Sequence, residues 1–358
     1  MTSSTTCIVT GGAGFIGCKI SAALADRYER VIVIDNLHPQ VHADRTRPEA
    51  LHPRAELVIA DVTDAVAWDQ LLAPLNSATV IHLAAETGTG QSLTEASRHA
   101  QVNVLGTTVM LDAFSRRDLL PERIVLTSSR AVYGEGPWMT ADASIVYPGQ
   151  RTRSQLAEGL WQRPGMTPLP ANARTTHPMP VSIYGATKLA QENILMSWCN
   201  SFGVSHVILR LQNVYGPGQS LSNPYVGIVS LFCRLAREGR SIPLYEDGTM
   251  LRDFVFIEDV ARAVISSLDL SPQSQPIDIG SGSPMTLGEA GTFIADLYGA
   301  PPPTLCGKYR FGDVRHASCV IDDSVNLFGT RPAWLPERGL KALSDWIEEQ
   351  LPPVAPRV

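Results

Sequence analysis

The chain has 358 residues, of which 44% are apolar and 18% are charged, and its formal net charge is −6. This composition allows a substantial core divided into about two domains, and it provides no basic field that would attract nucleic acid or an anionic membrane. The six cysteines include no C-x-x-C pair, so neither a zinc site nor a disulfide framework is indicated, and no metal is expected.

No apolar stretch approaches the ~20 residues that a membrane span requires. The first strand-like run begins at Cys7, which leaves no room for a signal peptide, and the scattered cysteines fit a reducing compartment. We therefore expect a cytoplasmic protein without a membrane partner or a nucleic-acid partner.

A glycine-rich turn follows the first apolar run. Cys7, Ile8 and Val9 have the character of a short buried strand, and the glycines beyond them open a helix that continues to Ala25. Glycine permits positive φ and close approach of backbone to a pyrophosphate, and the helix start offers free N–H groups. The pattern predicts a dinucleotide site, although glycine clusters also form ordinary turns. The candidate cofactor residues here are Gly11, Gly14, Phe15, Ile16 and Gly17.

A carboxylate ends the second apolar run. Residues 31–34 precede Asp35, eighteen positions after Gly17, where a carboxylate can accept hydrogen bonds from the adenosine ribose. Asp35 would repel a 2′-phosphate, and no arginine immediately follows it, so the sequence favours NAD over NADP. Asp35 and the next cofactor candidate, Asn36, could instead form only a turn.

Two further apolar runs end at polar or small residues. After a polar loop at 38–53, the run 57–60 precedes Asp61, which either contacts the adenine or caps the next helix. The run 79–85, expected to be a strand, contains His82, which we interpret as a buried structural histidine. Other cofactor candidates are Val62, Leu83, Ala84 and Ala85, and Glu86 is a candidate substrate residue.

The following segments continue an alternation of strands and helices. A loop at 88–92 precedes a helix expected over 94–116, which carries the cofactor candidate Asn103, and the run 124–129 ends in two hydroxyl residues. Functional groups at the ends of successive strands predict an α/β fold with a Rossmann-like, doubly wound parallel sheet. The site should lie along the carboxyl edge of that sheet.

Residues 138–180 break this alternation. Prolines recur in them, and only 154–162 is expected to form a short helix. A long connection in a compact domain is usually a functional lid or is disordered. The aromatic residues of the stretch favour an ordered lid, anchored beside the strand-end serines and the helix that follows.

A tyrosine and a lysine share one face of the next helix. Residues 182–200 are expected to be helical, which places Tyr184 and Lys188 one turn apart. A tyrosine that acts as a base at neutral pH needs ~4 kcal/mol of phenolate stabilisation, which a nearby ammonium and a positive nicotinamide can supply. Ser128 or Ser129 could share the proton. The alternative is an exposed pair with no catalytic role.

The chain resembles the extended short-chain dehydrogenase/reductase family, in particular its NAD-dependent nucleotide-sugar epimerases and dehydratases. Three motifs carry this resemblance: the glycine turn, the strand end T-S-S-x-x-V-Y-G and the Y-x-x-x-K pair. The resemblance continues at 209–218, 252–260 and 310–316. It implies that Asn213, Arg252 and Arg310 hold a diphosphate and that Asp313 binds a ribose. By resemblance, the catalytic residues are Ser129, Tyr184 and Lys188, of which the last two also bind NAD, and the substrate residues are Glu86, Ser129, Asn213, Arg252, Arg310 and Asp313.

Within this family, 4,6-dehydratases carry Asp-Glu immediately after the strand-end hydroxyl, where this chain has Arg130 and Ala131. The glutamate that decarboxylases need is not found at that strand end either. Epimerisation through a 4-keto intermediate and simple ketone reduction are the chemistries left. Residues 88–92, 146–153 and 212–225 most resemble the dTDP-L-rhamnose 4-epimerase branch of the family.

We therefore expect NAD-dependent C4 epimerisation of a nucleotide-activated hexose, a dTDP-6-deoxyhexose in the first instance. One alternative is an NAD(P)H-dependent 4-ketoreductase of a nucleotide-linked deoxysugar, and another is a non-catalytic NAD sensor or scaffold. The expected NAD-binding domain spans 1–213, with the lid at 138–180 and a return at 248–270. The expected sugar-nucleotide domain spans 214–247 and 271–350. Related enzymes dimerise through two helices, here those that carry Asn103 and Tyr184, so a homodimer is expected.

Overall fold

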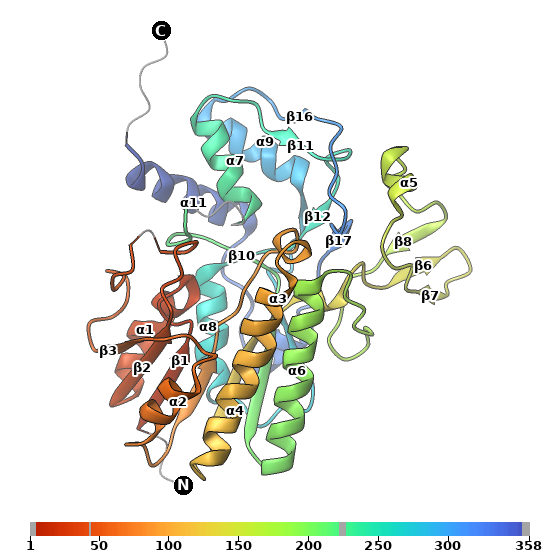
Figure 1. Ribbon diagram of the computed structural model, residues 1–358. Coiled ribbons are helices and arrows are strands. Elements are labelled where there is room, and N and C mark those ends of the chain that lie inside the picture. Colours follow the sequence, from red (N-terminus) through yellow and green to blue (C-terminus); the bar gives the residue numbers. More distant parts are fainter. Residues whose placement is uncertain (1–4, 43, 222–226, 353–358) are drawn as a thin grey trace.

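The computed structural model describes residues 5–42, 44–221 and 227–352. The last four residues of the stretch 212–225, which carries part of the family resemblance, lie outside the described residues. The chain forms a larger lobe around a parallel sheet and a smaller lobe that stands above the carboxyl edge of that sheet (Figure 1).

The sheet of the larger lobe has seven parallel strands in the order β14-β9-β5-β4-β1-β2-β3. The chain adds β2 and β3 on one side of β1 and then returns to add β4 on the other side. The strand order therefore reverses between β1 and β4, which is where doubly wound sheets bind their ligands. The predicted fold class is confirmed. The strands are β1 Thr6–Thr10, β2 Arg30–Asp35, β3 Ala55–Ile59, β4 Thr79–His82, β5 Arg123–Ser129, β9 Ser205–Leu211 and β14 Ile277–Ile279.

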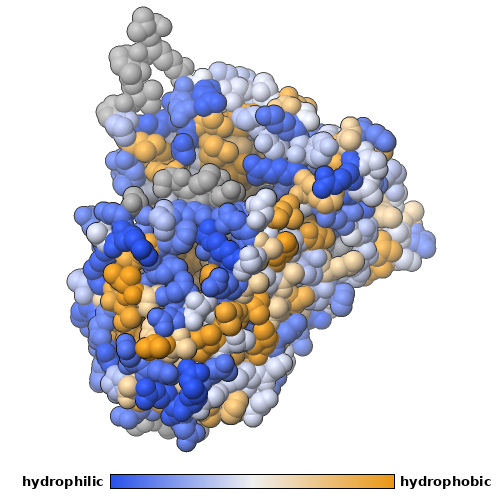
Figure 2. Space-filling model, viewed as in Figure 1, coloured by the Kyte–Doolittle hydropathy of each residue, from blue (hydrophilic) through white to orange (hydrophobic). Residues whose placement is uncertain are grey.

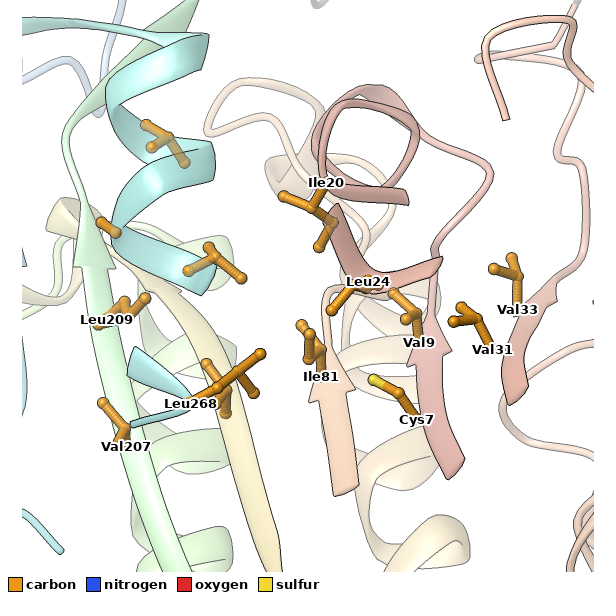
Figure 3. Packing of buried hydrophobic residues seen from close by; sticks show 14 of the residues in the cluster. Cys7, Val9, Ile20, Leu24, Val31, Val33, Ile81, Val207, Leu209 and Leu268 are labelled. Carbon is orange, nitrogen blue, oxygen red and sulfur yellow. The ribbon is translucent and has the colours of Figure 1, made fainter. Parts of the chain in front are cut away.

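Helices cover both faces of this sheet, because successive side chains of a strand point to opposite sides. Cys7 and Val9 of β1 pack with Ile20 and Leu24 on one face (Figure 3), while Ile8 belongs to the core of the other face. Strands buried on both sides are continuously apolar, which explains why the sequence revealed them. The first face is covered by α1 Phe15–Arg27 and α8 Ile257–Ser267, and the second by α2 Ala65–Leu72, α4 Gly106–Arg116 and α6 Ile183–Phe202.

Helix α6 agrees with its prediction, because both of its ends are encoded locally. The Ser182 hydroxyl accepts a hydrogen bond from the Gly185 N–H at 3.0 Å, and Gly203 ends the helix with φ +67°. An N-cap of this kind contributes about 1 kcal/mol.

The helix expected over 94–116 is composite. It consists of α3 (Ala96–His99), a π-helical segment η2 (Ala100–Leu105) and α4, after a short 3₁₀ turn η1 (Gln91–Leu93). π-Helical turns occur often at functional sites, and this one carries Asn103. The strand expected over 79–85 is shorter than predicted, because β4 ends at His82.

The smaller lobe has its own apolar core, which includes Phe232, Ile294 and Leu343. Its helices are α7 Ile228–Arg237, α9 Leu287–Tyr298 and α11 Pro336–Gln350. One of its sheets pairs β11 Pro243–Leu244 with β16 Thr304–Leu305. The other has the order β15 Met285–Thr286, β12 Leu251–Arg252 and β17 His316–Ala317. Between the lobes run the paired strands β10 Asn213–Tyr215 and β13 Phe254–Phe256, and α10 Asp322–Phe328 lies near β14.

Two strands depart from the expected domain division. Residues 271–350 are predicted to lie in the sugar-nucleotide domain, but β14 within them completes the large sheet beside β9. Residues 248–270 are predicted to return to the NAD-binding domain, and α8 does pack on α1, but β12 pairs with β15 and β17 of the smaller lobe. Strands of two or three residues carry too little pattern to show which sheet they join.

The insertion, residues 138–180, contains more regular structure than predicted. Strands β6 (Trp138–Thr140), β7 (Ile145–Val146) and β8 (Met166–Pro168) form an antiparallel sheet that projects beside the smaller lobe (Figure 1). The expected helix is only α5 (Arg153–Ala157). The prolines of the stretch favour an irregular loop, but Pro168 stands at the end of β8, Pro164 lies in a turn and the others lie outside the strands, so they are compatible with a small sheet.

Buried charges join the insertion to the smaller lobe. Arg151 lies 2.7 Å from Glu246, and Glu246 lies 2.9 Å from Arg315. All three side chains are almost completely buried. We call these three residues the insertion clamp. Trp138 packs edge-on against His316 of the smaller lobe, with ring centroids 5.3 Å apart.

Candidate active site

A cleft of about 470 Å³ opens at the carboxyl edge of the sheet, over the switch point between β1 and β4. A volume of this size is typical of a cofactor site. Four of the predicted site residues do not line the cleft, namely Asn103, Arg252, Arg310 and Asp313. The predicted residues that do line it are Gly11, Gly14, Phe15, Ile16, Gly17, Asp35, Asn36, Asp61, Val62, Leu83, Ala84, Ala85, Glu86, Ser129, Tyr184, Lys188 and Asn213.

The glycine turn forms the floor of the cleft. Gly11 has φ +64°, and a Cβ at this position would lie 2.7 Å from the backbone nitrogen of Ala84. A Cβ on Gly17 would lie 2.3 Å from the carbonyl oxygen of Gly12. The N-cap of helix α1 is Gly14, which has no side chain to cap the first N–H groups. Bare backbone and free donors at a helix start suit the diphosphate of a dinucleotide.

Asp35 stands at the end of β2 with both carboxylate oxygens held by backbone. It accepts hydrogen bonds from the N–H of Ala13 at 3.1 Å and from the N–H of Leu37 at 2.9 Å. These bonds fix a negative charge beside the glycine turn. The charge disfavours a phosphate at this place in the cleft.

Asp61 lies beside Asn36, whose amide donates to it at 2.8 Å. Burial acts to raise the pKa of Asp61, but hydrogen bonds from Thr63 and Asn36 outweigh it, so the pKa lies below its usual value. The N-cap of α2 is Asp64, which accepts hydrogen bonds from two N–H groups of the helix. The helix-capping interpretation of Asp61 is therefore wrong, and its side chain faces the cleft.

The two strand-end serines make different contacts. Ser128 donates to Glu192 at 2.5 Å, and Glu192 is itself paired with Arg210 at 2.7 Å. Ser129 makes the hydrogen bond to the phenol of Tyr184. Of the two serines that the sequence left open as partners of the tyrosine, Ser129 is therefore the one in contact with it.

Burial shifts the pKa values of both Tyr184 and Lys188. Burial raises the pKa of Tyr184, while the hydrogen bond to Ser129 and the charge of Arg130 act in the opposite direction. Burial lowers the pKa of Lys188 to about 7, and the carboxylate of Glu192 opposes this shift. The protein cation that acts on the phenol is thus Arg130, a residue to which the sequence pattern assigned no role in the site.

Arg130 also connects the cleft to the smaller lobe. Burial and the positive charge of Arg252 lower the pKa of Arg130 to about 10, while Asp313 and Tyr184 act to raise it. Arg252 is buried on β12, and Arg310 lies over the ring of Tyr245 at 5.2 Å. Of the predicted diphosphate and ribose residues, Arg252, Arg310 and Asp313 thus belong to the smaller lobe and lie outside the lining of the cleft, whereas Asn213 lines it. The only sequence signal for Arg130 is its position immediately after Ser129.

Glu86 and Asn103 form a connected pair at the edge of the cleft. The amide of Asn103 accepts from the N–H of Glu86 at 2.8 Å and donates to its carbonyl at 3.0 Å. Glu86 forms an ion pair with Arg98 at 2.8 Å. Asn103 is fully buried, so the structure places it behind the cleft wall, where it holds the loop that carries Glu86. Arg98 lines the cleft and was not singled out in the sequence, because nothing in its local pattern distinguishes it from a surface arginine.

Comparison with known proteins agrees with this arrangement. The family model described as "NAD dependent epimerase/dehydratase family" matches residues 7–280. The chain belongs to this family. NAD is therefore its cofactor, as the glycine turn and Asp35 predicted, and the resemblance drawn from the motifs is confirmed.

The relatives include proteins of similar length. A dTDP-L-rhamnose 4-epimerase of Burkholderia thailandensis is 57% identical over 345 residues, which cover 96% of this chain and 95% of the relative. The structure of a Thermus thermophilus UDP-glucose 4-epimerase in complex with NAD is 26% identical, with a TM-score of 0.76, and covers 97% of this chain and 100% of that chain. A Bacillus cereus UDP-glucuronic acid 4-epimerase, 23% identical with a TM-score of 0.77 over 97% of this chain and 100% of that chain, shares the fold.

None of the helices within the described residues has the length and apolar character needed to cross a membrane. Within the same residues, no group of three or more histidine, cysteine or acidic side chains is placed to hold a metal ion.

Proposed function

We propose that this family member is an NAD-dependent 4-epimerase of a dTDP-6-deoxyhexose, with dTDP-L-rhamnose as the first substrate to test. The observation that carries the proposal is the 57% identity, over 96% of the chain, to a dTDP-L-rhamnose 4-epimerase. Inversion at C4 of L-rhamnose gives 6-deoxy-L-talose, so the expected product is the corresponding dTDP-6-deoxytalose. The residues around the cleft are chemically suited to this reaction.

The cleft fits NAD for the reasons already given. An added Cβ at Gly11 or Gly17 would collide with backbone, and the start of α1 has no side-chain cap. NAD bound there supplies reversible acceptance of hydride from C4 of the sugar. We assign Gly11, Gly14, Phe15, Ile16 and Gly17 to its diphosphate side. Further cofactor contacts are proposed for Asp35, Asn36, Asp61, Val62, Leu83, Ala84, Ala85, Tyr184 and Lys188.

Tyr184 is the proposed base. Its phenolate takes the proton of the 4-hydroxyl as the C4–H bond breaks, which leaves a ketone at C4. Ser129 keeps the phenol oriented and shares the hydrogen bond, and the positive charge of Arg130 stabilises the phenolate. We assign the same role to Lys188, which lies one helical turn from Tyr184. Because burial alone raises the pKa of Tyr184, these charges and the positive ring of oxidised nicotinamide must all contribute. After the ketosugar has turned, Tyr184 returns the proton to the oxygen while hydride adds to the other face of C4.

The sugar must turn over between the two hydride transfers, so the binding energy has to come from the nucleotide and the diphosphate. We assign the diphosphate to Asn213, Arg252 and Arg310 and the ribose to Asp313. Guanidinium groups make bidentate bonds to phosphate oxygens, which holds the nucleotide while the sugar rotates. We also propose that the smaller lobe, without β14, is the sugar-nucleotide domain. That the insertion covers the sugar stays a prediction, since none of its residues lines the cleft.

The test is conversion without added cofactor. Purified protein is incubated with dTDP-L-rhamnose alone, and the products are identified by NMR. An epimerase converts the sugar nucleotide to a mixture of C4 epimers with no net change in NAD. Stoichiometric consumption of added NADH or NADPH with a 4-ketosugar, and no conversion without it, would indicate the ketoreductase instead. NAD binding without turnover of any dTDP-, UDP-, GDP- or CDP-sugar would indicate a sensor or scaffold.

We further propose a homodimer. Apolar side chains gather over α4 and α6 (Figure 2), and Leu105 at the start of this surface is 48% exposed. Met196 and Trp198 are partly exposed on α6. Burial of such a surface against a second copy is the expected use of a large apolar patch. Light scattering at micromolar concentration tests it, and the mass of a single chain would exclude it.

A further inference from the structure

Lys188 is held by a side chain on its own helix. Its ammonium donates to the carbonyl oxygen of Thr127 at 2.7 Å and to the amide oxygen of Gln191, which lies three residues further along α6. Gln191 is completely buried, and Lys188 is nearly so. A buried ammonium depends on such acceptors, because water cannot replace them. Of the two acceptors, the side chain of Gln191 is the one that a mutation can remove.

A second set of contacts fixes the orientation of the Gln191 amide. Its nitrogen lies 2.8 Å from the hydroxyl oxygen of Thr107 and 3.0 Å from Nε2 of His82. The Thr107 hydroxyl donates to the carbonyl of Asn103 at 2.7 Å, so its oxygen accepts from the amide. A reversed amide would place its N–H donors against the Lys188 ammonium. The contacts of Thr107 therefore keep the amide oxygen turned toward Lys188.

His82 closes this arrangement without adding charge. Burial, and to a lesser extent the charge of Lys188, lower the pKa of His82 to about 3, so the ring is neutral at physiological pH. Its Nδ1 lies 2.6 Å from the hydroxyl of Thr10, whose oxygen accepts from the Ala84 N–H at 3.1 Å. The histidine interpreted from sequence as structural thus forms part of the wall behind the proposed catalytic lysine.

We propose that Gln191 is a positioning residue of the reaction, which acts through Lys188. Its amide oxygen holds Lys188 as an ammonium beside Tyr184, and Thr107 with neutral His82 holds that oxygen in place. The inference rests on the proposed roles of Tyr184 and Lys188.

Several charged or titratable groups surround the pair, and each stays unchanged in the test. Those that face Lys188 are Glu192 of α6, which is paired with Arg210 of β9, and His82 of β4. Those that face Tyr184 are Ser129 at the end of β5, Arg130 of the 3₁₀ turn η3 (Arg130–Tyr133) and the ring of His99 of α3, at 6.4 Å.

The first variant is Gln191→Met, which keeps the length of the side chain and removes the acceptor. Hydrogen bonds to charged groups are strong, so the loss of this one should lower the pKa of Lys188 by about 1 to 2 units. Loss of positive charge beside the phenol then raises the pKa of Tyr184. The limb of kcat/KM that rises with pH should shift to higher pH by about 1 unit. The difference in tyrosinate absorbance between each protein and its Tyr184→Phe counterpart measures the same shift without turnover.

A matched pair of variants tests the contact between the Thr107 hydroxyl and the Gln191 amide. Thr107→Val keeps the shape of the side chain but removes the hydroxyl, and should shift the limb in the same direction as Gln191→Met but less. Thr107→Ser keeps the hydroxyl and should leave the limb in place. This pair also serves if Gln191→Met fails to fold.

Tyr215→Phe is the control for loss of a buried hydrogen bond, since the Tyr215 hydroxyl donates to the Pro336 carbonyl at 3.1 Å, outside the cleft. It should lower Tm without moving the limb. The inference is wrong if Gln191→Met and Thr107→Val lower Tm as this control does and leave both the limb and the tyrosinate titration at their wild-type positions. Wild-type turnover by Tyr184→Phe would instead overturn the proposed function, so the two failures are distinguishable.

Discussion

The cleft and the insertion clamp both bury charged side chains, but they treat them differently. In the clamp, Arg151 and Arg315 close on Glu246 at 2.7 and 2.9 Å. In the cleft, Asp35 is held by backbone N–H groups and Lys188 by the oxygen atoms of uncharged groups, while Glu86 and Arg98 form the one ion pair described above. Charges that are paired inside the protein join its parts. Charges that are left facing a cavity are available to a ligand, and their pKa values are the ones that matter for chemistry.

The largest effect is expected from Tyr184→Phe, which alters the cleft without altering its packing. Loss of the phenol oxygen removes the proposed base, and a loss of turnover of about 10²- to 10⁴-fold or more is expected. NAD content and Tm should stay close to wild type. The measurement is conversion of dTDP-L-rhamnose followed by NMR, with NAD content read from absorbance. Turnover within about tenfold of wild type would show that another group is the base, with Ser129 as the next to examine.

Arg151→Met should lower the stability of the protein and leave NAD binding unchanged, because it breaks the insertion clamp and leaves the cleft intact. Removing one partner of a buried ion pair typically costs about 3 to 5 kcal/mol, and the retained Arg315 places the expected loss near the lower end. Urea unfolding measures it, and NAD binding by calorimetry should be unchanged. A loss below about 1 kcal/mol would mean that the clamp contributes no more than a surface pair.

Cofactor choice tests whether the cleft charges are directed at a ligand. Asp35→Ala combined with Asn36→Arg replaces a repulsive charge by a guanidinium that can bind a 2′-phosphate. Selectivity should move toward NADP by about tenfold or more, which corresponds to one charge-assisted hydrogen bond. Calorimetry with both cofactors gives the ratio. If neither affinity changes, Asp35 is only a turn residue.

The smallest effect is expected from Arg174→Ala, the matched control for the clamp. Arg174 pairs with Asp323 at 2.9 Å and also joins the insertion to another part of the chain, here α10, but its side chain is 58% exposed. An exposed pair of this kind contributes about 0 to 1 kcal/mol. Unfolding under the conditions used for Arg151→Met should show this contrast. Equal losses for the two variants would contradict the view that burial decides what an ion pair contributes.

Much of the cleft could be predicted from sequence because its residues are coupled to local backbone. Gly11 and Gly17 are required by the turn itself, and Asp35 is fixed by its position at a strand end. Tyr184 and Lys188 follow from helical spacing. By contrast, Arg98 and Arg130 were missed, because their places in the site depend on segments that meet only after folding.

The sequence by itself determined the alternation of buried strands and helices, the glycine turn and the positions of the proposed catalytic residues. Each of these depends on hydrophobic period, backbone freedom or spacing within one element. Only the tertiary structure decided that Ser129 rather than Ser128 meets the phenol, that β14 joins the large sheet and that Gln191 faces Lys188. Those outcomes depend on which groups, distant in the chain, share one buried space, and on the requirement that each buried polar atom find a partner there.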